Sequence, residues 1–300
     1  MSVLTFASYG TGYGALLEGE GESLIDAVDR DTVLQQLADS GYILFRGFEV
    51  DIDHFSAFVR ALSTRVSLDP ARSFGGSGGV AQKVDAGVDA VGLHCENGNS
   101  PFLPDLCWFY CERAAVEGSQ TTVCDGYRAW DALSEATRRR FLDKKIVYSR
   151  RVEEDKWKRF AFHMLEGRKP IDQIVLDDIL APVRGNANVR ITGNDDGSIH
   201  YAFEVAAARQ PQFGGERIAF ANSILGPSYN YETPKITFAD GEEFPEPLLA
   251  EIRDATESVT ENIDWQDGDV LLIDNTRAMH GRRAIRDANR VIYNALSDIR

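Results

Sequence analysis

Leu93-His94-Cys95-Glu96 is the stretch around which the rest of the chain can be organised. Successive side chains alternate between the two faces of a β-strand, so this pattern predicts His94 and Glu96 on one face and Cys95 on the other. Two such ligands can occupy adjacent positions on a metal ion, and a second histidine would complete a facial triad. Five histidines and 47 acidic residues make one such pair unremarkable by chance, so the motif needs support from elsewhere in the chain.

Length and charge narrow the class of protein. A chain of 300 residues with 43% hydrophobic content can bury one large core, so we expect a single domain over residues 1–300. The net charge of −15 at pH 7 repels nucleic acid and anionic membranes, so we expect neither as a partner. No stretch has the composition of a signal peptide or a membrane-spanning helix, which predicts a soluble, cytoplasmic protein.

The four cysteines favour the same compartment. Cys95, Cys107, Cys111 and Cys124 form no CxxC pair and lie in apolar stretches that resemble core strands. We therefore expect buried free thiols of a reducing compartment rather than a zinc site or disulfides.

Hydrophobic patterning predicts strands from residue 93 onward, with helices early in the chain and between strands. The amphipathic segment 51–62 begins at Asp51 or Asp53, which can cap a helix. The predicted strands are 42–45, 106–111, 117–124 after a turn, 145–148, 188–192, 198–203, 217–222, 265–275 after a turn, and 290–294; the other predicted helices are 23–37, 127–142 and 247–259. This order predicts a mainly β protein, a jelly-roll barrel with helices packed outside it.

Two glycine-rich segments have different interpretations. Residues 9–14 (YGTGYG) follow no convincing strand, so a flexible loop is favoured over a nucleotide-binding turn. Residues 72–87 hold five glycines and lead towards His94, so we interpret them as a lid or substrate loop rather than a plain linker. Gln82 is a natural polar contact of that loop.

The remaining histidines differ in their surroundings. His54 stands at the start of a helix and suits a surface or capping role. His163 lies between apolar residues and suits packing, and His200, in a predicted strand, suits a structural or surface role. His280 stands beyond the end of the predicted strand 265–275.

Three features coincide in order: His94-x-Glu96, His280, and Arg290 ten residues later. The order resembles that of the taurine and 2,4-dichlorophenoxyacetate dioxygenase superfamily of Fe(II)/2-oxoglutarate enzymes. It is most similar to the branch with a glutamate ligand, which includes clavaminate synthase and amino-acid β-hydroxylases. Other pieces that resemble the family are 41–47 (GYILFRG), 117–121 (EGSQT), 265–275 (WQDGDVLLIDN) and 279–282 (MHGR).

The resemblance implies that His94, Glu96 and His280 bind Fe(II), and that Thr121 and Arg290 hold the distal carboxylate of 2-oxoglutarate. A bidentate guanidinium suits a carboxylate in a semi-dry pocket. With O2 as the second co-substrate, such an enzyme releases succinate and CO2 and oxidises an unactivated C–H bond. Glu96 disfavours a halogenase, because those relatives carry a small residue in place of the carboxylate.

Two positions depart from the family pattern. Ser119 replaces the second glycine of the family's turn, so either Thr121 or Thr122 can face inward. Asn294 stands where some relatives carry a second arginine, which makes a strongly anionic substrate group less expected.

The implied function is hydroxylation, desaturation or cyclisation of a small molecule, an amino acid or a natural-product intermediate, free or bound to a carrier protein. Gln82, Asn97 and Asn294 are candidate substrate contacts. The alternative is a cupin-like metal protein without oxidative chemistry, or a degenerate paralogue. Thr121 and Arg290 favour the oxygenase, since a non-oxidative site has no need of a carboxylate clamp.

Overall fold

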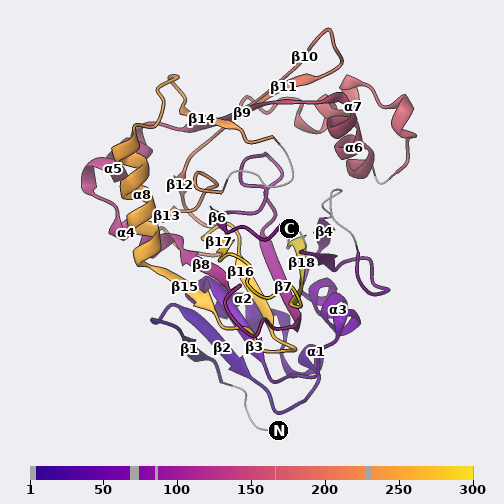
Figure 1. Cartoon of the computed structure of the whole chain (residues 1–300), viewed down its shortest axis with the longest axis vertical. Helices are drawn as coiled ribbons and strands as arrows, with labels where there is room; N and C mark the ends of the chain where they lie inside the picture. Colours follow the sequence, from indigo (N-terminus) through magenta and orange to yellow (C-terminus); the bar gives the residue numbers. More distant parts are fainter. Residues whose placement is uncertain (1–4, 68–73, 85–86, 166, 227–231, 300) are drawn as a thin grey trace.

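Two β-sheets, antiparallel except for one parallel strand pair in the larger sheet, lie face to face at the centre of the computed structural model, which describes residues 5–67, 74–84, 87–165, 167–226 and 232–299 (Figure 1). In the larger sheet the order is β1 (Ala7–Tyr9), β2 (Gly14–Glu18), β3 (Tyr42–Arg46), β16 (Val270–Asp274), β7 (Leu106–Arg113), β18 (Val291–Asp298) and β4 (Arg65–Ser67), with β5 (Gln82–Lys83) also paired to β18. In the smaller sheet the order is β15 (Thr260–Ile263), β8 (Thr121–Asp125), β17 (Ala278–Arg282) and β6 (Val91–His94).

Apolar side chains fill the space between these two sheets. Leu44, Phe109 and Leu271 from the larger sheet pack in one cluster with Val123 and Ile263 from the smaller sheet. Leu271 and Ile263 are fully buried, and burial of such a side chain stabilises the fold by roughly 1.5–3 kcal/mol. The predicted mainly β core is confirmed.

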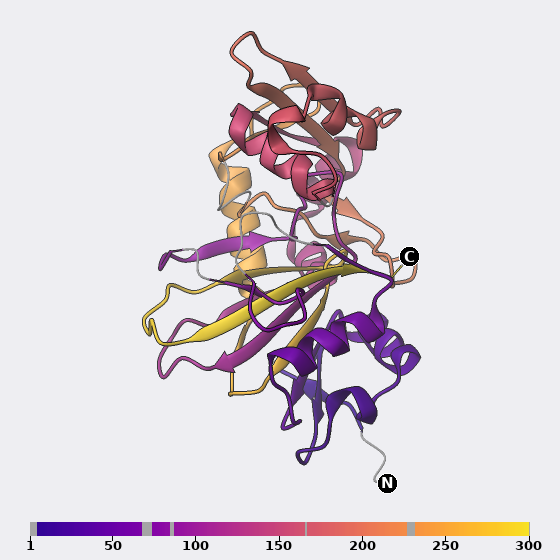
Figure 2. The same cartoon turned by 90° about the vertical axis from the view of Figure 1, so that its right-hand side faces the viewer.

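Helices α1 (Leu24–Ala27), α2 (Arg30–Ser40) and α3 (Ile52–Leu62) cover the outer face of the larger sheet (Figure 2). The Asp51 carboxylate accepts hydrogen bonds from the backbone N–H groups of Asp53 and His54, and the His54 ring accepts one from the Asp51 N–H. The predicted helix and the capping role of His54 are confirmed. On the buried face of α3, Phe58 meets Trp108 edge-on at 5.7 Å between ring centroids.

Helices α4 (Gly126–Ala132), α5 (Glu135–Asp143) and α8 (Glu246–Ser258) cover the outer face of the smaller sheet. The predicted helical stretch 127–142 is confirmed, but it is divided into two helices at Ser134, which has an extended backbone and whose hydroxyl accepts the Thr137 N–H at 3.2 Å. A serine in this position starts a new helix by satisfying an N–H group that would otherwise lack a partner. The predicted C-terminal helix is confirmed as α8.

A third sheet lies at the end of the long axis opposite the N-terminus (Figures 1 and 2). Its order is β10 (Val189–Gly193), β11 (Ile199–Val205), β9 (Ile146–Val152) and β14 (Lys235–Phe238). Beside it lie α6 (Glu154–Met164), α7 (Leu176–Leu180) and the short 3-10 turns η1 (Ile171–Gln173) and η2 (Ala181–Val183). The predicted hairpin of β10 and β11 is confirmed. The predicted strand 217–222 is shorter, since only β13 (Ala219–Phe220) forms, paired with β12 (Ala208–Arg209).

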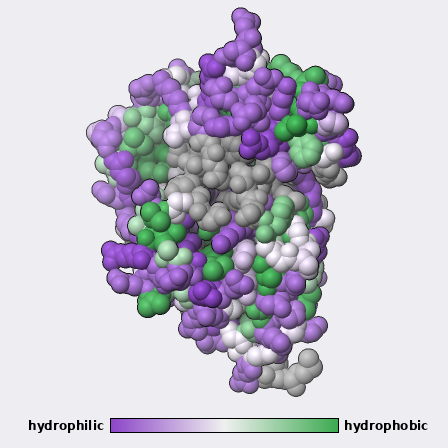
Figure 3. Space-filling view, turned by 45° about the vertical axis from the view of Figure 1, so that its right-hand side comes forward, coloured by the Kyte–Doolittle hydropathy of each residue, from purple (hydrophilic) through white to green (hydrophobic). Residues whose placement is uncertain are grey.

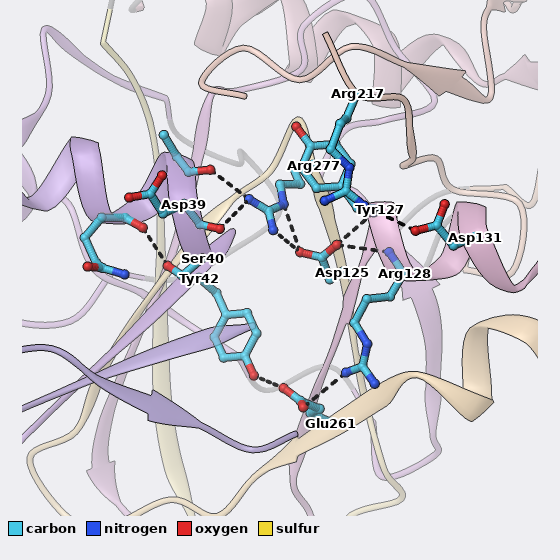
Figure 4. Close-up of polar contacts among 12 residues, drawn as sticks. Asp39, Ser40, Tyr42, Asp125, Tyr127, Arg128, Asp131, Arg217, Glu261 and Arg277 are labelled. Carbon is cyan, nitrogen blue, oxygen red and sulfur yellow. Dashed lines mark hydrogen bonds and ion pairs between the residues drawn. The ribbon is translucent and has the colours of Figure 1, made fainter. Parts of the chain in front are cut away.

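A buried polar network joins the N-terminal segment to the smaller sheet (Figure 4). Arg277 forms an ion pair of 2.6 Å with Asp125, and both side chains are almost fully buried. Arg277 also donates to the carbonyl oxygens of Ala38 and Asp39 at the end of α2. Removing one partner of such a buried pair typically destabilises a protein by about 3–5 kcal/mol, so this network fixes α2 against the barrel.

The surface is largely polar. On the face shown in Figure 3, hydrophilic residues predominate and apolar residues appear in small, separate groups. Within the described ranges, no helix has both the length and the apolar character that a membrane crossing requires. Cys95, Cys107, Cys111 and Cys124 are all buried, and none of them forms a disulfide within the described residues.

Candidate active site

His94, Glu96 and His280 come together inside the barrel. Their ligand atoms all lie within 4.8 Å of one another, with Glu96 Oε2 at 3.8 Å from His94 Nε2 and 3.4 Å from His280 Nε2. Adjacent ligands bound to one metal ion at about 2.1 Å are separated by about 3 Å, so small side-chain shifts would close this group around an ion. Two imidazoles and one carboxylate with open positions are the donor set of non-haem Fe(II) sites.

Strand pairing brings the two histidines together. His94 on β6 is the direct partner of His280 on β17, and their ring centroids are 4.4 Å apart. His280 lies beyond the end of the strand predicted at 265–275, as expected, but the absence of a predicted strand at His280 itself was wrong, because this residue lies in the middle of β17.

The prediction that Glu96 lies on a strand is also wrong. Strand β6 ends at His94, and Glu96 begins a turn in which Asn97 has a positive φ of 55°. Asn97, Gly98 and Asn99 are residues that favour such turns. The carboxylate therefore approaches the histidines from a turn, not from the alternation of a strand.

A hydrogen bond at Nδ1 of the His94 ring leaves Nε2 available to bind a metal ion. His94 Nδ1 lies 2.8 Å from the carbonyl oxygen of Gly92, and because a carbonyl only accepts, Nδ1 carries the proton. Nε2 then presents its lone pair. The His94 side chain is 18% exposed and that of His280 is 5% exposed, so the group is more open on the His94 side.

Thr121 faces the same interior as His280. In the pairing of β8 with β17, Thr121 is opposite Arg282 and Val123 is opposite His280. Directly paired side chains share one face of a sheet, so Thr121 points inward, whereas Thr122, opposite Gly281, points outward. The structure thereby distinguishes the two threonines that the sequence left open.

Arg290 lies at the same end of the barrel as Thr121. It is buried, and its Nη1 donates a hydrogen bond of 2.7 Å to the carbonyl oxygen of Ser119. Burial, and then the nearby guanidinium of Arg282, lower the pKa of Arg290 to about 10. A buried guanidinium whose charge is disfavoured by burial and by a second cation favours a bound anion nearby.

Sequence reasoning missed two residues at this end of the barrel. Trp265 Nε1 donates to Thr121 Oγ1 at 3.1 Å, and an indole can only donate, so the Thr121 proton is directed elsewhere and is available to an acceptor. Arg282 donates from Nη2 to the carbonyl oxygens of Gly87 and Asp89. Arg282 could have been found from strand alternation, because it stands two residues after His280.

Two of the three predicted substrate contacts are neighbours. Gln82 on β5 pairs directly with Asn294 on β18, and both side chains are fully buried. Asn294 also pairs with Phe109, whose ring lies 5.2 Å from that of His280. Asn97 is exposed and directly follows Glu96.

The predicted lid, residues 72–87, is only partly described. Residues 72, 73, 85 and 86 lie outside the described residues. Within the described part, Gln82 belongs to strand β5, and Phe74 forms an isolated bridge with it. The role of this loop as a lid stays a prediction.

The sequence of this chain is similar to that of known proteins. A model of the taurine catabolism dioxygenase TauD, TfdA family matches residues 8–296. The chain belongs to this family. The chain is 24% identical to the dapdiamide synthesis protein DdaC of Enterobacter agglomerans, an alignment covering 87% of this chain and 83% of DdaC. It is 25% identical to a clavaminate synthase-like protein of Arabidopsis thaliana, covering 85% of this chain and 81% of that protein.

Solved structures share the fold. A putative alpha-ketoglutarate-dependent taurine dioxygenase from Burkholderia xenovorans matches with a TM-score of 0.63 and 14% identity, covering 98% of this chain and 92% of that chain. PvcB, an Fe, alpha-ketoglutarate dependent oxygenase from an isonitrile synthetic pathway, matches with a TM-score of 0.61 and 14% identity, covering 98% and 90%. The predicted jelly-roll core with flanking helices is confirmed. As a TauD/TfdA protein, the chain is an Fe(II)- and 2-oxoglutarate-dependent dioxygenase.

Proposed function

We propose that this dioxygenase hydroxylates, or desaturates or cyclises, an unactivated C–H bond of an amino acid or a natural-product intermediate, and releases succinate and CO2. The observation that carries the proposal is the position of the His94, Glu96 and His280 group in a barrel that also buries Arg290 beside Arg282. The names of two similar proteins refer to dapdiamide synthesis and to an isonitrile synthetic pathway, which supports a biosynthetic small molecule.

Each residue has a defined role in this proposal. His94, Glu96 and His280 hold Fe(II), and Arg290 pairs with the distal carboxylate of 2-oxoglutarate. Thr121 donates its hydroxyl proton to the same carboxylate, because the Trp265 N–H already occupies the hydroxyl oxygen. When bound, iron and 2-oxoglutarate supply with O2 the oxidising equivalent that the protein itself lacks.

The polar residues near the group suggest what the substrate offers. Gln82, Asn97 and Asn294 are all neutral amides, and each can both donate and accept hydrogen bonds. They suit a neutral polar group of the substrate rather than a strong anion. The 72–87 loop would close over a small substrate. That substrate is a free amino acid or, as an alternative, an aminoacyl group bound to a carrier protein.

The same proposal includes the setting in which the enzyme works. We propose one catalytic domain over residues 1–300, since the metal ligands and the two residues assigned to 2-oxoglutarate come from β6, the turn after it, β8, β17 and the segment before β18. A reducing compartment such as the cytoplasm is supported by the four buried cysteines, which form no disulfide within the described residues.

A screen for succinate release tests the proposal. The protein is incubated with Fe(II), 2-oxoglutarate and O2 over free amino acids, aminoacyl groups on carrier proteins and small biosynthetic intermediates. Mass analysis then separates hydroxylation, which adds one oxygen atom, from desaturation or ring closure, which removes two hydrogen atoms. Substrate-dependent succinate release that is lost in His280→Ala supports the proposal; absence of both Fe(II) binding and 2-oxoglutarate binding in the wild type contradicts it.

A further inference from the structure

One fully buried side chain holds the peptide groups on both sides of the Glu96 Cα. The Asn275 Oδ1 accepts the Glu96 N–H at 2.8 Å, and the Asn275 Nδ2 donates to the Glu96 carbonyl oxygen at 3.0 Å. The same Nδ2 donates to the Pro104 carbonyl oxygen at 3.0 Å. Both amide N–H bonds and the amide oxygen are therefore used in holding this turn.

The turn needs such support because it has left the sheet. Strand β6 ends at His94, so the Glu96 backbone has no ladder of hydrogen bonds to a neighbouring strand. The preceding residue is held in a similar way, because the Cys95 N–H donates to the Asn222 carbonyl oxygen and the Cys95 carbonyl oxygen accepts the Ser223 hydroxyl, both at 2.9 Å. The ligand carboxylate thus stands on a backbone fixed by side chains and loops.

Asn275 also connects Glu96 to the strand that carries the other buried ligand. It follows β16 directly, in the tight connection that leads into β17 and His280, where the Arg277 N–H donates to the Asp274 carbonyl oxygen at 3.1 Å. Its own N–H donates to the Asp105 carbonyl oxygen at 3.0 Å. Asn275 and Glu96 are 179 positions apart in the chain, so one amide fixes two distant ligand-bearing segments to each other.

We propose that Asn275 is a positioning residue for the metal centre: it fixes the Glu96 backbone so that the carboxylate lies within reach of an Fe(II) ion shared with His94 and His280. The proposal rests on the metal site of the proposed function and adds a residue that touches no reacting atom. Residues that hydrogen-bond to metal ligands and thereby orient them typically contribute about 10–100-fold to metal affinity.

Substitutions at Asn275 separate positioning from general stability. Asn275→Asp keeps the shape but replaces the donor Nδ2 by an oxygen facing two carbonyl oxygens, and Asn275→Ala removes all three hydrogen bonds. Ser223→Ala is a milder variant that removes one bond to Cys95 and serves if the Asn275 variants do not fold. Tyr42→Phe is the matched control. Tyr42 lies on β3 of the larger sheet, and the variant loses the buried hydrogen bond from the Tyr42 hydroxyl to Glu261 in the network of Figure 4.

The measurement is anaerobic titration of each apo-protein with Fe(II) against a coloured chelator, together with the melting temperature in the absence of metal. We expect about 10–100-fold weaker Fe(II) binding for the Asn275 variants, a smaller loss for Ser223→Ala, and unchanged affinity for Tyr42→Phe despite a lower melting temperature. Unchanged Fe(II) affinity in folded Asn275→Asp or in Ser223→Ala would overturn the inference. Absence of Fe(II) binding in the wild type would instead overturn the proposed function.

Discussion

Arg290 donates a hydrogen bond of 2.7 Å to the carbonyl oxygen of Ser119, whose backbone is left-handed at a φ of 61°. Glycine adopts this conformation more easily than serine does. The Ser119 hydroxyl, however, accepts the Arg286 N–H at 2.9 Å, a contact that a glycine could not make. Ser119 therefore holds both the Arg290 guanidinium and the segment that leads to Arg290, two residues before Thr121.

The first prediction concerns Arg290 and 2-oxoglutarate. Losing one partner of a buried, charge-assisted pair costs on the order of 2–5 kcal/mol, so Arg290→Ala should weaken 2-oxoglutarate binding roughly 30-fold or more. Arg290→Lys should recover only part of this, because an ammonium cannot reproduce the planar fork. Anaerobic titration of 2-oxoglutarate into the Fe(II) protein, followed by its charge-transfer absorption, measures the effect.

Arg184 provides the control for this experiment. Its ion pair with Asp177 is exposed on both sides, and such pairs contribute about 0–1 kcal/mol. Arg184→Ala should therefore leave the 2-oxoglutarate titration unchanged. Identical curves for Arg290→Ala and wild type would show that the resemblance to the family does not extend to this arginine.

The second prediction concerns the two histidines. His94→Ala and His280→Ala each remove a proposed metal ligand, so Fe(II) binding and turnover should be lost. The melting temperature of the apo-protein should change only modestly, because the packed core between the sheets is formed by other residues. Isothermal titration with Fe(II) and thermal melting check this, and full activity in either variant would exclude that histidine as a ligand.

The third prediction concerns Glu96. Glu96→Ala removes the carboxylate and opens a coordination position, so hydroxylation should collapse, and a low level of chloride entry becomes feasible. Mass analysis of the product in chloride buffer measures both outcomes. An unchanged yield of hydroxylated product would mean that this carboxylate is structural.

The fourth prediction concerns residues 72–87. If they form a lid, hydrogen exchange of this segment should slow when Fe(II), 2-oxoglutarate and substrate are all present, since a glycine-rich loop loses conformational entropy on closure. Exchange mass spectrometry on peptides from the segment measures the change, with a peptide from α8 as the control. Equal exchange with and without ligands would leave the segment an ordinary connection.

The fifth prediction concerns pH and stability. Burial raises the pKa of the Asp274 carboxyl to about 6, and within the described residues its Oδ2 has no hydrogen-bond partner. The folded state therefore binds this proton more tightly than the unfolded state, so the group's stabilising contribution is present below about pH 4 and is lost as the pH rises through about 6.

Asp274→Asn cannot titrate and isolates this contribution. Relative to the wild type, the variant's free energy of unfolding should rise between pH 4 and pH 6 by an amount on the order of 3 kcal/mol, at about 1.4 kcal/mol per pH unit. Urea unfolding at a series of pH values measures it. A difference between the two proteins that does not vary with pH would contradict the raised pKa.

The sequence by itself determined the elements whose signals are local. The apolar spacing and the Asp51 cap predicted α3, and the turn residues between 193 and 197 predicted the β10–β11 hairpin. The order of His94, Glu96, His280 and Arg290 was sufficient to predict the family. These signals can be read directly from the sequence because each depends on residue type and spacing alone.

Only the tertiary structure decided how the candidate residues meet. The pairing of β8 with β17 turned Thr121 inward and placed Arg282 beside Arg290. The turn after His94, rather than strand alternation, places Glu96 beside the histidines. Asn275, which is 179 positions away in the sequence, hydrogen-bonds to the Glu96 backbone and fixes it. The pairing of Thr121 with Arg282 and the hydrogen bonds between Glu96 and Asn275 join residues more than a hundred positions apart. No local sequence period records which distant side chain will satisfy a buried peptide group.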